Sequence, residues 1–128
     1  MAILLDTHAA LWWLMEPEKL SRKARRSMAD ADEAIFISAV SMFEVAQKAR
    51  RGRLPYPPAL LNRFPSLFDA QGWVPLAISI SHAHRAGGYS QEHRDPFDRL
   101  LAAQAELEGC GLVTSDPAFR DFPVKVVW

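Results

Sequence analysis

The sequence predicts an α/β fold, in which a central parallel sheet of four to five strands is covered by helices on both faces. Short apolar runs alternate with longer stretches of helical periodicity along the 128 residues, which is the pattern of strands joined by crossover helices. The apolar runs show no polar alternation, as is typical of strands buried on both faces. The length fits one domain over residues 1–128. We therefore expect a three-layer α/β/α sandwich.

The predicted elements follow one another with clear boundary signals. Strands are expected at Ala2–Leu5, Ala34–Ile37, Trp73–Ile78, Leu112–Thr114 and Val124–Val127. Helices are expected at Thr7–Met15, Ser21 to about Asp30, Ser38–Arg51, Pro58 to near Gly72, Ser79–Ala86 and Pro96–Glu108. Pro65 must kink or interrupt the fourth helix, and Gly87-Gly88 is expected to end the fifth. The pair Asp95-Pro96 is typical of an N-cap followed by the first helical residue.

Composition excludes several classes of protein. Fifteen basic and fifteen acidic residues give a formal net charge of zero, so no whole-protein field attracts nucleic acid. The single cysteine, Cys110, excludes a disulfide framework and favours a cytoplasmic location. No apolar run approaches the ~20 residues of a membrane span, and the start Met-Ala-Ile-Leu-Leu-Asp is not typical of a signal peptide. Contact with nucleic acid must therefore come from local basic stretches.

Carboxylates follow the ends of the predicted strands. Asp6 comes directly after the first strand, Asp116 closely follows the fourth, and Glu44 lies two turns into the helix after the second. Because the carboxyl ends of parallel strands meet at one edge of a sheet, these side chains are expected to converge. Converging carboxylates repel one another unless a cation is present, and oxygen ligands suit Mg²⁺.

Asp98, in the first turn of the helix before the fourth strand, is harder to place. A helix that leads into a strand is expected to start at the opposite edge of the sheet, unless the loop 89–95 carries it back. Each acid also has a purely structural interpretation. Asp6 and Asp95 fit helix caps, Asp98 a favourable charge at a helix start, Asp116 the beginning of a turn and Glu44 an exposed helical residue.

Five segments in order along the chain resemble the PIN-domain family and, within it, the VapC-type toxins of bacterial toxin–antitoxin pairs. They are LLDTHAALWWL at 4–14, ISAVSMFEVAQKARRGRL at 37–54, HRDPFDRLLAAQAELEG at 93–109, LVTSD at 112–116 and the terminal VKVVW. The resemblance implies a PIN-like sandwich and an endoribonuclease that depends on Mg²⁺, with Mn²⁺ as a substitute. It also implies RNA as substrate, a VapB-like antitoxin that covers the catalytic pocket, and a homodimer.

The same resemblance assigns site residues. The family's acids fall on Asp6, Glu44, Asp116 and the Asp98 that heads the motif D-x-x-x-A-A, with Asp95 as a possible fifth ligand. Thr7, Ser41 and Ser115 match small hydroxyl positions near the family's site and would orient water or ligands. Independently of the resemblance, Arg99 is a supporting candidate because Arg94 and Arg99 flank Asp98 and would bind phosphate or temper the repulsion between acids. The implied reaction is attack by a metal-activated water, which leaves a 5′-phosphate and needs no ribose 2′-hydroxyl.

Other interpretations compete with this one. Intact acids at all four family positions argue against a PIN-like fold kept as a non-catalytic RNA- or protein-binding module. An aspartyl phosphatase would need an acid where His8 stands, and His82, His84 and His93 have poor spacing for zinc. The basic stretches 22–26 and 48–63 are either solvated surface or phosphate contacts. Trp12, Trp13 and Phe43 pack in the core or line a groove for the antitoxin.

Overall fold

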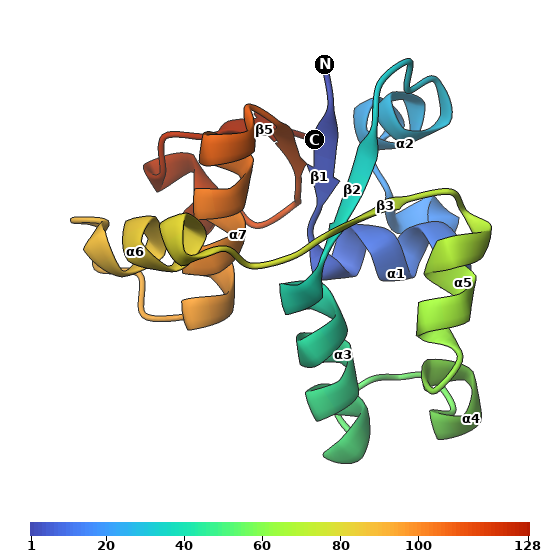
Figure 1. Cartoon of the computed structure of the whole chain (residues 1–128). Helices are drawn as coiled ribbons and strands as arrows, with labels where there is room; N and C mark the ends of the chain where they lie inside the picture. The colour runs from blue at the N-terminus through green and yellow to red at the C-terminus, as the bar shows by residue number, and fades with distance from the viewer.

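A computed structural model describes residues 1–128 and shows the expected α/β architecture (Figure 1). One sheet contains all the strands, namely β1 (Ile3–Leu5), β2 (Ile35–Ser38), β3 (Val74–Leu76), β4 (Gly111–Val113) and β5 (Lys125–Val127). Every neighbouring pair is parallel, and the spatial order is β3-β2-β1-β4-β5. The prediction of a parallel sheet with four to five strands is therefore confirmed.

Seven α-helices connect the strands. They are α1 (Thr7–Met15), α2 (Arg22–Ala29), α3 (Ala39–Arg50), α4 (Pro58–Leu61), α5 (Phe64–Ala70), α6 (Ile80–Gly88) and α7 (Pro96–Glu108). Two 3₁₀ turns, η1 (Pro17–Lys19) and η2 (Pro117–Asp121), follow α1 and β4. Side-chain caps are found at helix starts that the sequence indicated. At the start of α2, for example, Ser21 Oγ accepts a hydrogen bond from Ala24 N at 3.0 Å.

Three predicted elements differ from the structure. The helix expected from Pro58 to near Gly72 is two short helices, α4 and α5, because Pro65 has no N–H to continue the first one and instead occupies the first turn of the second. Helix α6 continues through Gly87-Gly88 instead of ending before them. Strand β3 is shorter than expected, and its Pro75 is tolerated because β3 lies at the sheet edge.

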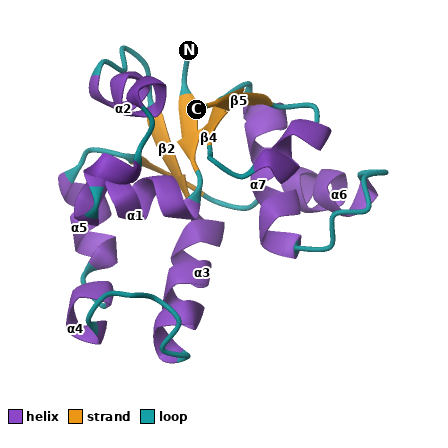
Figure 2. Cartoon of the chain, turned by 180° about the vertical axis from the view of Figure 1, so that it is seen from behind, coloured by secondary structure: helices purple, strands orange, loops and turns teal.

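Both faces of the sheet are buried. Ile3 and Leu5 point into a core with α1, α2, α4 and α5, whereas Leu4 points into a second core with α6 and α7. Figure 2 shows the two groups of helices on opposite sides of the strands. This two-sided burial explains why the strands are continuously apolar. Cys110 packs in the second core as a buried free thiol.

The carboxyl edge of the sheet is where the helices separate. Helix α3 leaves β2 at this edge and projects away from the strands, and α1 crosses below β1 (Figure 1). The amide N of Asp6 donates to Val113 O at 3.0 Å, which ties the end of β1 to the end of β4. No helix is long and apolar enough to span a bilayer.

Candidate functional site

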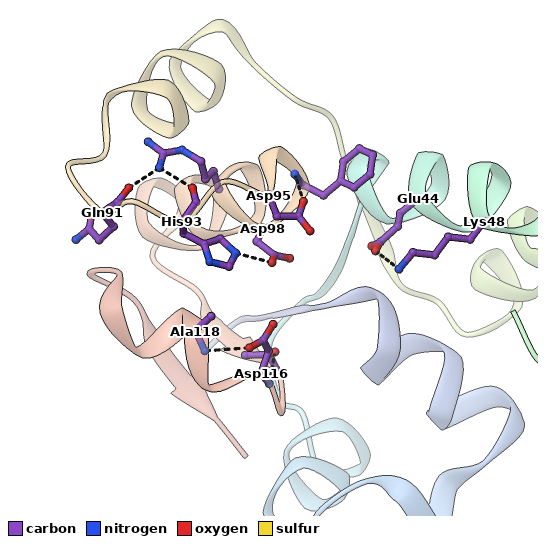
Figure 3. A network of polar contacts seen from close by, with 11 residues as sticks. Glu44, Lys48, Gln91, His93, Asp95, Asp98, Asp116 and Ala118 are labelled. Atoms are coloured by element: carbon purple, nitrogen blue, oxygen red, sulfur yellow. Dashed lines mark hydrogen bonds and ion pairs between the residues drawn. The ribbon is translucent and has the colours of Figure 1, made fainter. Parts of the chain in front are cut away.

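A polar cavity of about 430 Å³ opens at the carboxyl edge of the sheet. Five carboxylates from four segments line it, namely Asp6, Glu44, Asp95, Asp98 and Asp116. Figure 3 shows Glu44 on α3, Asp95 and Asp98 at the start of α7, and Asp116 after β4 around one common space. The structure thus brings together the acids that the sequence analysis selected.

Asp6 is the most buried of these acids, with 7% of its surface exposed. Its Oδ1 accepts from Ala9 N at 2.7 Å, so the predicted helix cap is real. The pKa of Asp6 is raised to about 6, mainly by burial and also by the charges of Glu44 and Asp98, while hydrogen bonds from Thr114 and Ala9 oppose the shift. A cap and a cavity ligand are therefore compatible roles for one side chain.

Glu44 is held by neighbours on two helices. Its Oε1 lies 2.5 Å from Thr7 Oγ1, and the Thr7 hydroxyl also lies 3.0 Å from Ser41 Oγ. Its Oε2 accepts from Lys48 Nζ at 2.6 Å, one helical turn away. Thr7 thus fixes the carboxylate, Ser41 contacts the Thr7 hydroxyl, and Lys48 supplies a positive charge at the cavity wall.

Asp98 lies at the carboxyl edge, contrary to the expectation that a helix leading into a strand starts at the opposite edge. The crossover helix α7 runs antiparallel to the strands, so it must begin at their carboxyl ends and finish at their amino ends. Accordingly Asp95, Asp98 and Leu101 line the cavity, whereas Glu108 is followed within three residues by Gly111, which begins β4. The loop 89–95 joins α6 to this start.

The side chains of Asp95 and Asp98 have different partners. Asp95 is exposed, and its Oδ1 caps α7 by accepting from Phe97 N at 2.9 Å. Asp98 is half-buried, and its Oδ2 lies 2.7 Å from His93 Nε2. Burial raises the pKa of Asp98, as do the charges of Asp95 and Asp116, while the His93 hydrogen bond lowers it. The sequence does not predict this contact of His93 with Asp98, because two side chains that meet across an irregular loop leave no periodic signal.

Asp116 and Ser115 are exposed, as is Asp95. Asp116 Oδ1 accepts from Ala118 N at 2.9 Å and caps η2, while its own amide N donates to Thr114 Oγ1 at 3.1 Å (Figure 3). Ser115 lines the cavity without a side-chain hydrogen bond. The turn expected at Asp116-Pro117 is therefore present and directs a carboxylate to the cavity.

Arg99 lies outside the cavity lining. Its guanidinium donates to the carbonyl oxygens of Ala86, Gly87, Tyr89, Gln91 and His93, at 2.8, 3.4, 2.8, 2.7 and 3.0 Å. These acceptors end α6 and form the loop that delivers His93 and Asp95. The side chain therefore organises this loop instead of facing the acids.

The donor set fits a hydrated divalent cation. No group of three or more His, Cys, Asp or Glu side chains is arranged to hold a metal ion by itself. Mg²⁺ characteristically keeps several waters and uses few carboxylates, and the cavity has room for such a complex. Burial is the main cause of the raised pKa values of Asp6 and Asp98, and the neighbouring carboxylates add to both shifts; a bound cation would offset that repulsion.

Comparisons with known proteins agree with this fold. A family model described as the PIN domain matches residues 3–125. Ribonuclease VapC22 from Mycobacterium tuberculosis is 35% identical over 118 residues, which are 92% of this chain and 89% of that protein. A VapBC structure from Salmonella typhimurium bound to DNA contains a chain with a TM-score of 0.76 and 17% identity, covering 98% of this chain and 96% of the other. A chain of VapBC2 from Rickettsia felis, in a structure bound to a DNA fragment from the promoter, has a TM-score of 0.75 and 16% identity. The match covers 98% of this chain and 97% of the other.

Proposed function

The chain belongs to the PIN-domain family, and on this premise we propose that it is a metal-dependent endoribonuclease whose acidic cavity is the active site. The convergence of five carboxylates on one cavity is the observation that carries the proposal. PIN-domain ribonucleases are typically metal-dependent, and the relative from Mycobacterium tuberculosis is named as a ribonuclease. RNA is therefore the proposed substrate.

Asp6, Glu44, Asp98 and Asp116 are the proposed ligands, with Asp95 as a further oxygen donor. Mg²⁺, or Mn²⁺ in its place, would supply a Lewis acid that lowers the pKa of a water and offsets charge on the phosphodiester. Thr7, itself in contact with Ser41, holds Glu44 in position, and His93 holds Asp98. Ser115, which has no partner of its own, is available to orient a water or the substrate.

A water nucleophile predicts characteristic products. Cleavage would leave a 5′-phosphate, and an RNA whose 2′-hydroxyls are methylated would still be cut, because the ribose oxygen is not the nucleophile. The decisive experiment measures Mg²⁺-dependent cleavage of labelled RNA pools by the wild type, Asp6→Asn and Asp98→Asn. Asp30→Asn, at the exposed end of α2, is the matched control.

The expected result is loss of cleavage in both cavity variants and full activity in the control. Equal cleavage by wild type and Asp6→Asn would remove the site from the proposal. Tight RNA binding by the wild type without cleavage would favour the alternative, a PIN fold that serves as a non-catalytic binding module.

The proposed biological role is that of a toxin paired with a VapB-like antitoxin, acting as a homodimer in the cytoplasm. The VapBC assemblies among the structural neighbours support the antitoxin partner. Light scattering coupled to size-exclusion chromatography tests the dimer, which predicts twice the 14.4 kDa mass of the chain. A monomer at micromolar concentration would contradict this part of the proposal.

A further inference from the structure

A second cavity, of about 400 Å³, lies next to the acidic one. It is bounded by α1, the η1 turn, the end of α3 and the segment 53–56. His8, Trp12 and Lys48 line both cavities, so the two are neighbouring parts of one continuous surface. We call the second one the aromatic–basic pocket, after its side chains His8, Trp12, Lys19, Lys48, Arg53 and Tyr56.

The charges of the two cavities are opposite. The acidic cavity contains five carboxylates, whereas the lining of the aromatic–basic pocket contains three cations and no acid. Lys19 and Lys48 each have one carboxylate partner, Glu16 at 3.3 Å and Glu44 at 2.6 Å. The guanidinium of Arg53 makes no ion pair or hydrogen bond, and the residue is exposed. An anionic chain that enters the acidic cavity gains its nearest phosphate contacts here.

The aromatic side chains are held in place. Trp12 is half-buried and packs against Trp128 and His8, with ring centroids 5.9 and 5.5 Å apart. Tyr56 donates its hydroxyl to Glu16 Oε2 at 2.6 Å, which fixes the ring beside η1. Lys19 Nζ lies 5.9 Å from the Trp12 ring. Aromatic faces beside cations are the features that bind unpaired nucleotides, through base stacking and phosphate contact.

We propose that the aromatic–basic pocket binds a nucleotide adjacent to the scissile phosphate, with an unpaired base stacked on Trp12 and a phosphate held by Arg53 and Lys19. The identity of the substrate as RNA rests on the proposed function above. The pocket selects single-stranded RNA over a duplex, since a paired base cannot reach the indole face. Lys48, at the boundary of the two cavities, lies between the bound nucleotide and the metal ligands.

The test separates base from phosphate recognition. Binding of two fluorescein-labelled decamers is measured by anisotropy in EDTA, so that no metal-dependent cleavage occurs. One decamer is single-stranded RNA, and the other carries a stable abasic analogue at each position but keeps all phosphates. Wild type is compared with Arg53→Gln, Lys19→Gln and Trp12→Leu. Lys125→Gln, an exposed lysine on β5, is the matched control.

Two distinct losses are expected. Trp12→Leu weakens RNA binding roughly tenfold but leaves the abasic decamer unaffected, because only stacking is lost. Arg53→Gln and Lys19→Gln weaken both decamers several-fold, and each lowers the slope of log Kd against log salt by about 0.7. Lys125→Gln behaves as wild type. The folding of each variant is checked by circular dichroism and thermal unfolding.

Wild-type binding of RNA by both Arg53→Gln and Lys19→Gln would overturn the proposal, and these exposed substitutions keep it testable if Trp12→Leu fails to fold. If Trp12→Leu weakens the binding of both decamers equally, the indole has a structural role and the proposed base stacking is wrong. Failure of the proposed nuclease function can be told apart from failure of the pocket proposal. If only the nuclease function fails, the wild type shows no Mg²⁺-dependent cleavage, but the pocket variants still lose binding as described.

Discussion

The acidic cavity has two walls that are built differently. The β1–α3 wall contains Asp6, which is fixed by the Ala9 amide at the start of α1, and Glu44, which is fixed by the Thr7 hydroxyl of the same helix. The α7 wall contains Asp95 and Asp98, whose positions depend on an irregular loop held by the Arg99 guanidinium. Both walls follow the topology of the sheet, but the second also depends on the hydrogen bonds of one side chain, Arg99, to the loop before α7. Perturbation should therefore affect the two walls unequally.

The largest expected effect comes from Arg99→Ala, which removes the donor for five carbonyl oxygens. We expect the free energy of unfolding to fall by about 3 kcal/mol, because charge-assisted bonds and partly buried acceptors are lost together. Urea denaturation measures this change. Arg94→Ala, an exposed arginine of the same loop that makes no side-chain hydrogen bond, should change stability by less than about 0.5 kcal/mol. If the free energy of unfolding falls by a similar amount in both variants, Arg99 does not hold the loop in the way proposed.

Asp6→Asn should stabilise the metal-free protein at neutral pH. The folded-state pKa of about 6 exceeds the ordinary value of 3.8, so the native state binds the proton more tightly. Stability contributed by protonated Asp6 is therefore lost as pH rises from about 4 to 6. Asparagine keeps the helix cap and carries no charge, so unfolding at pH 7.5 should become harder by about 2 kcal/mol. An unchanged or lower melting temperature in EDTA would contradict the burial argument.

The same carboxyl group should make Mg²⁺ binding depend on pH. Protons compete with the metal at Asp6, and below pH 6 the affinity should fall by about tenfold per pH unit. Asp98, whose pKa is also raised, adds to the slope. Isothermal titration calorimetry between pH 5 and 8 measures the profile. A flat profile down to pH 5 would mean that neither acid is a ligand.

His93→Ala tests the α7 wall without replacing a proposed ligand. The imidazole holds Asp98 through a 2.7 Å contact, and removing the partner of a ligand typically costs 10- to 100-fold in metal affinity. We expect about a tenfold rise in the Kd for Mg²⁺, with partial rescue by His93→Gln, whose amide can donate to Asp98. His84→Ala, on the exposed surface of α6, is the control. Equal affinity in wild type and His93→Ala would show that Asp98 needs no partner.

The difference between the walls also explains what sequence could predict. The strand ends placed Asp6 and Asp116, and the helix after β2 placed Glu44, because parallel strands share one carboxyl edge. Asp98 was predicted only through the family resemblance, because the expected direction of the crossover helix was wrong: α7 begins at the carboxyl edge. The roles of Arg99 and His93 depend on side chains that meet across an irregular loop, and no periodicity encodes such contacts. Likewise, Pro65 predicted a kink or an interruption in the helix after Pro58, and the sequence alone did not decide between the two.

The smallest effect should come from Lys48→Gln on the β1–α3 wall, and its two readouts should move in opposite directions. The ammonium lies 2.6 Å from Glu44, so it competes with a cation for that carboxylate and repels it. Without Lys48, the Kd for Mg²⁺ should fall two- to fivefold, in line with about 0.5–1 kcal/mol for a partly exposed ion pair. RNA affinity should weaken by a similar factor, because the lysine also lines the aromatic–basic pocket. Calorimetry and anisotropy on one preparation measure both. If both affinities fall together, Lys48 is a structural support of the wall and not a charge shared by two sites.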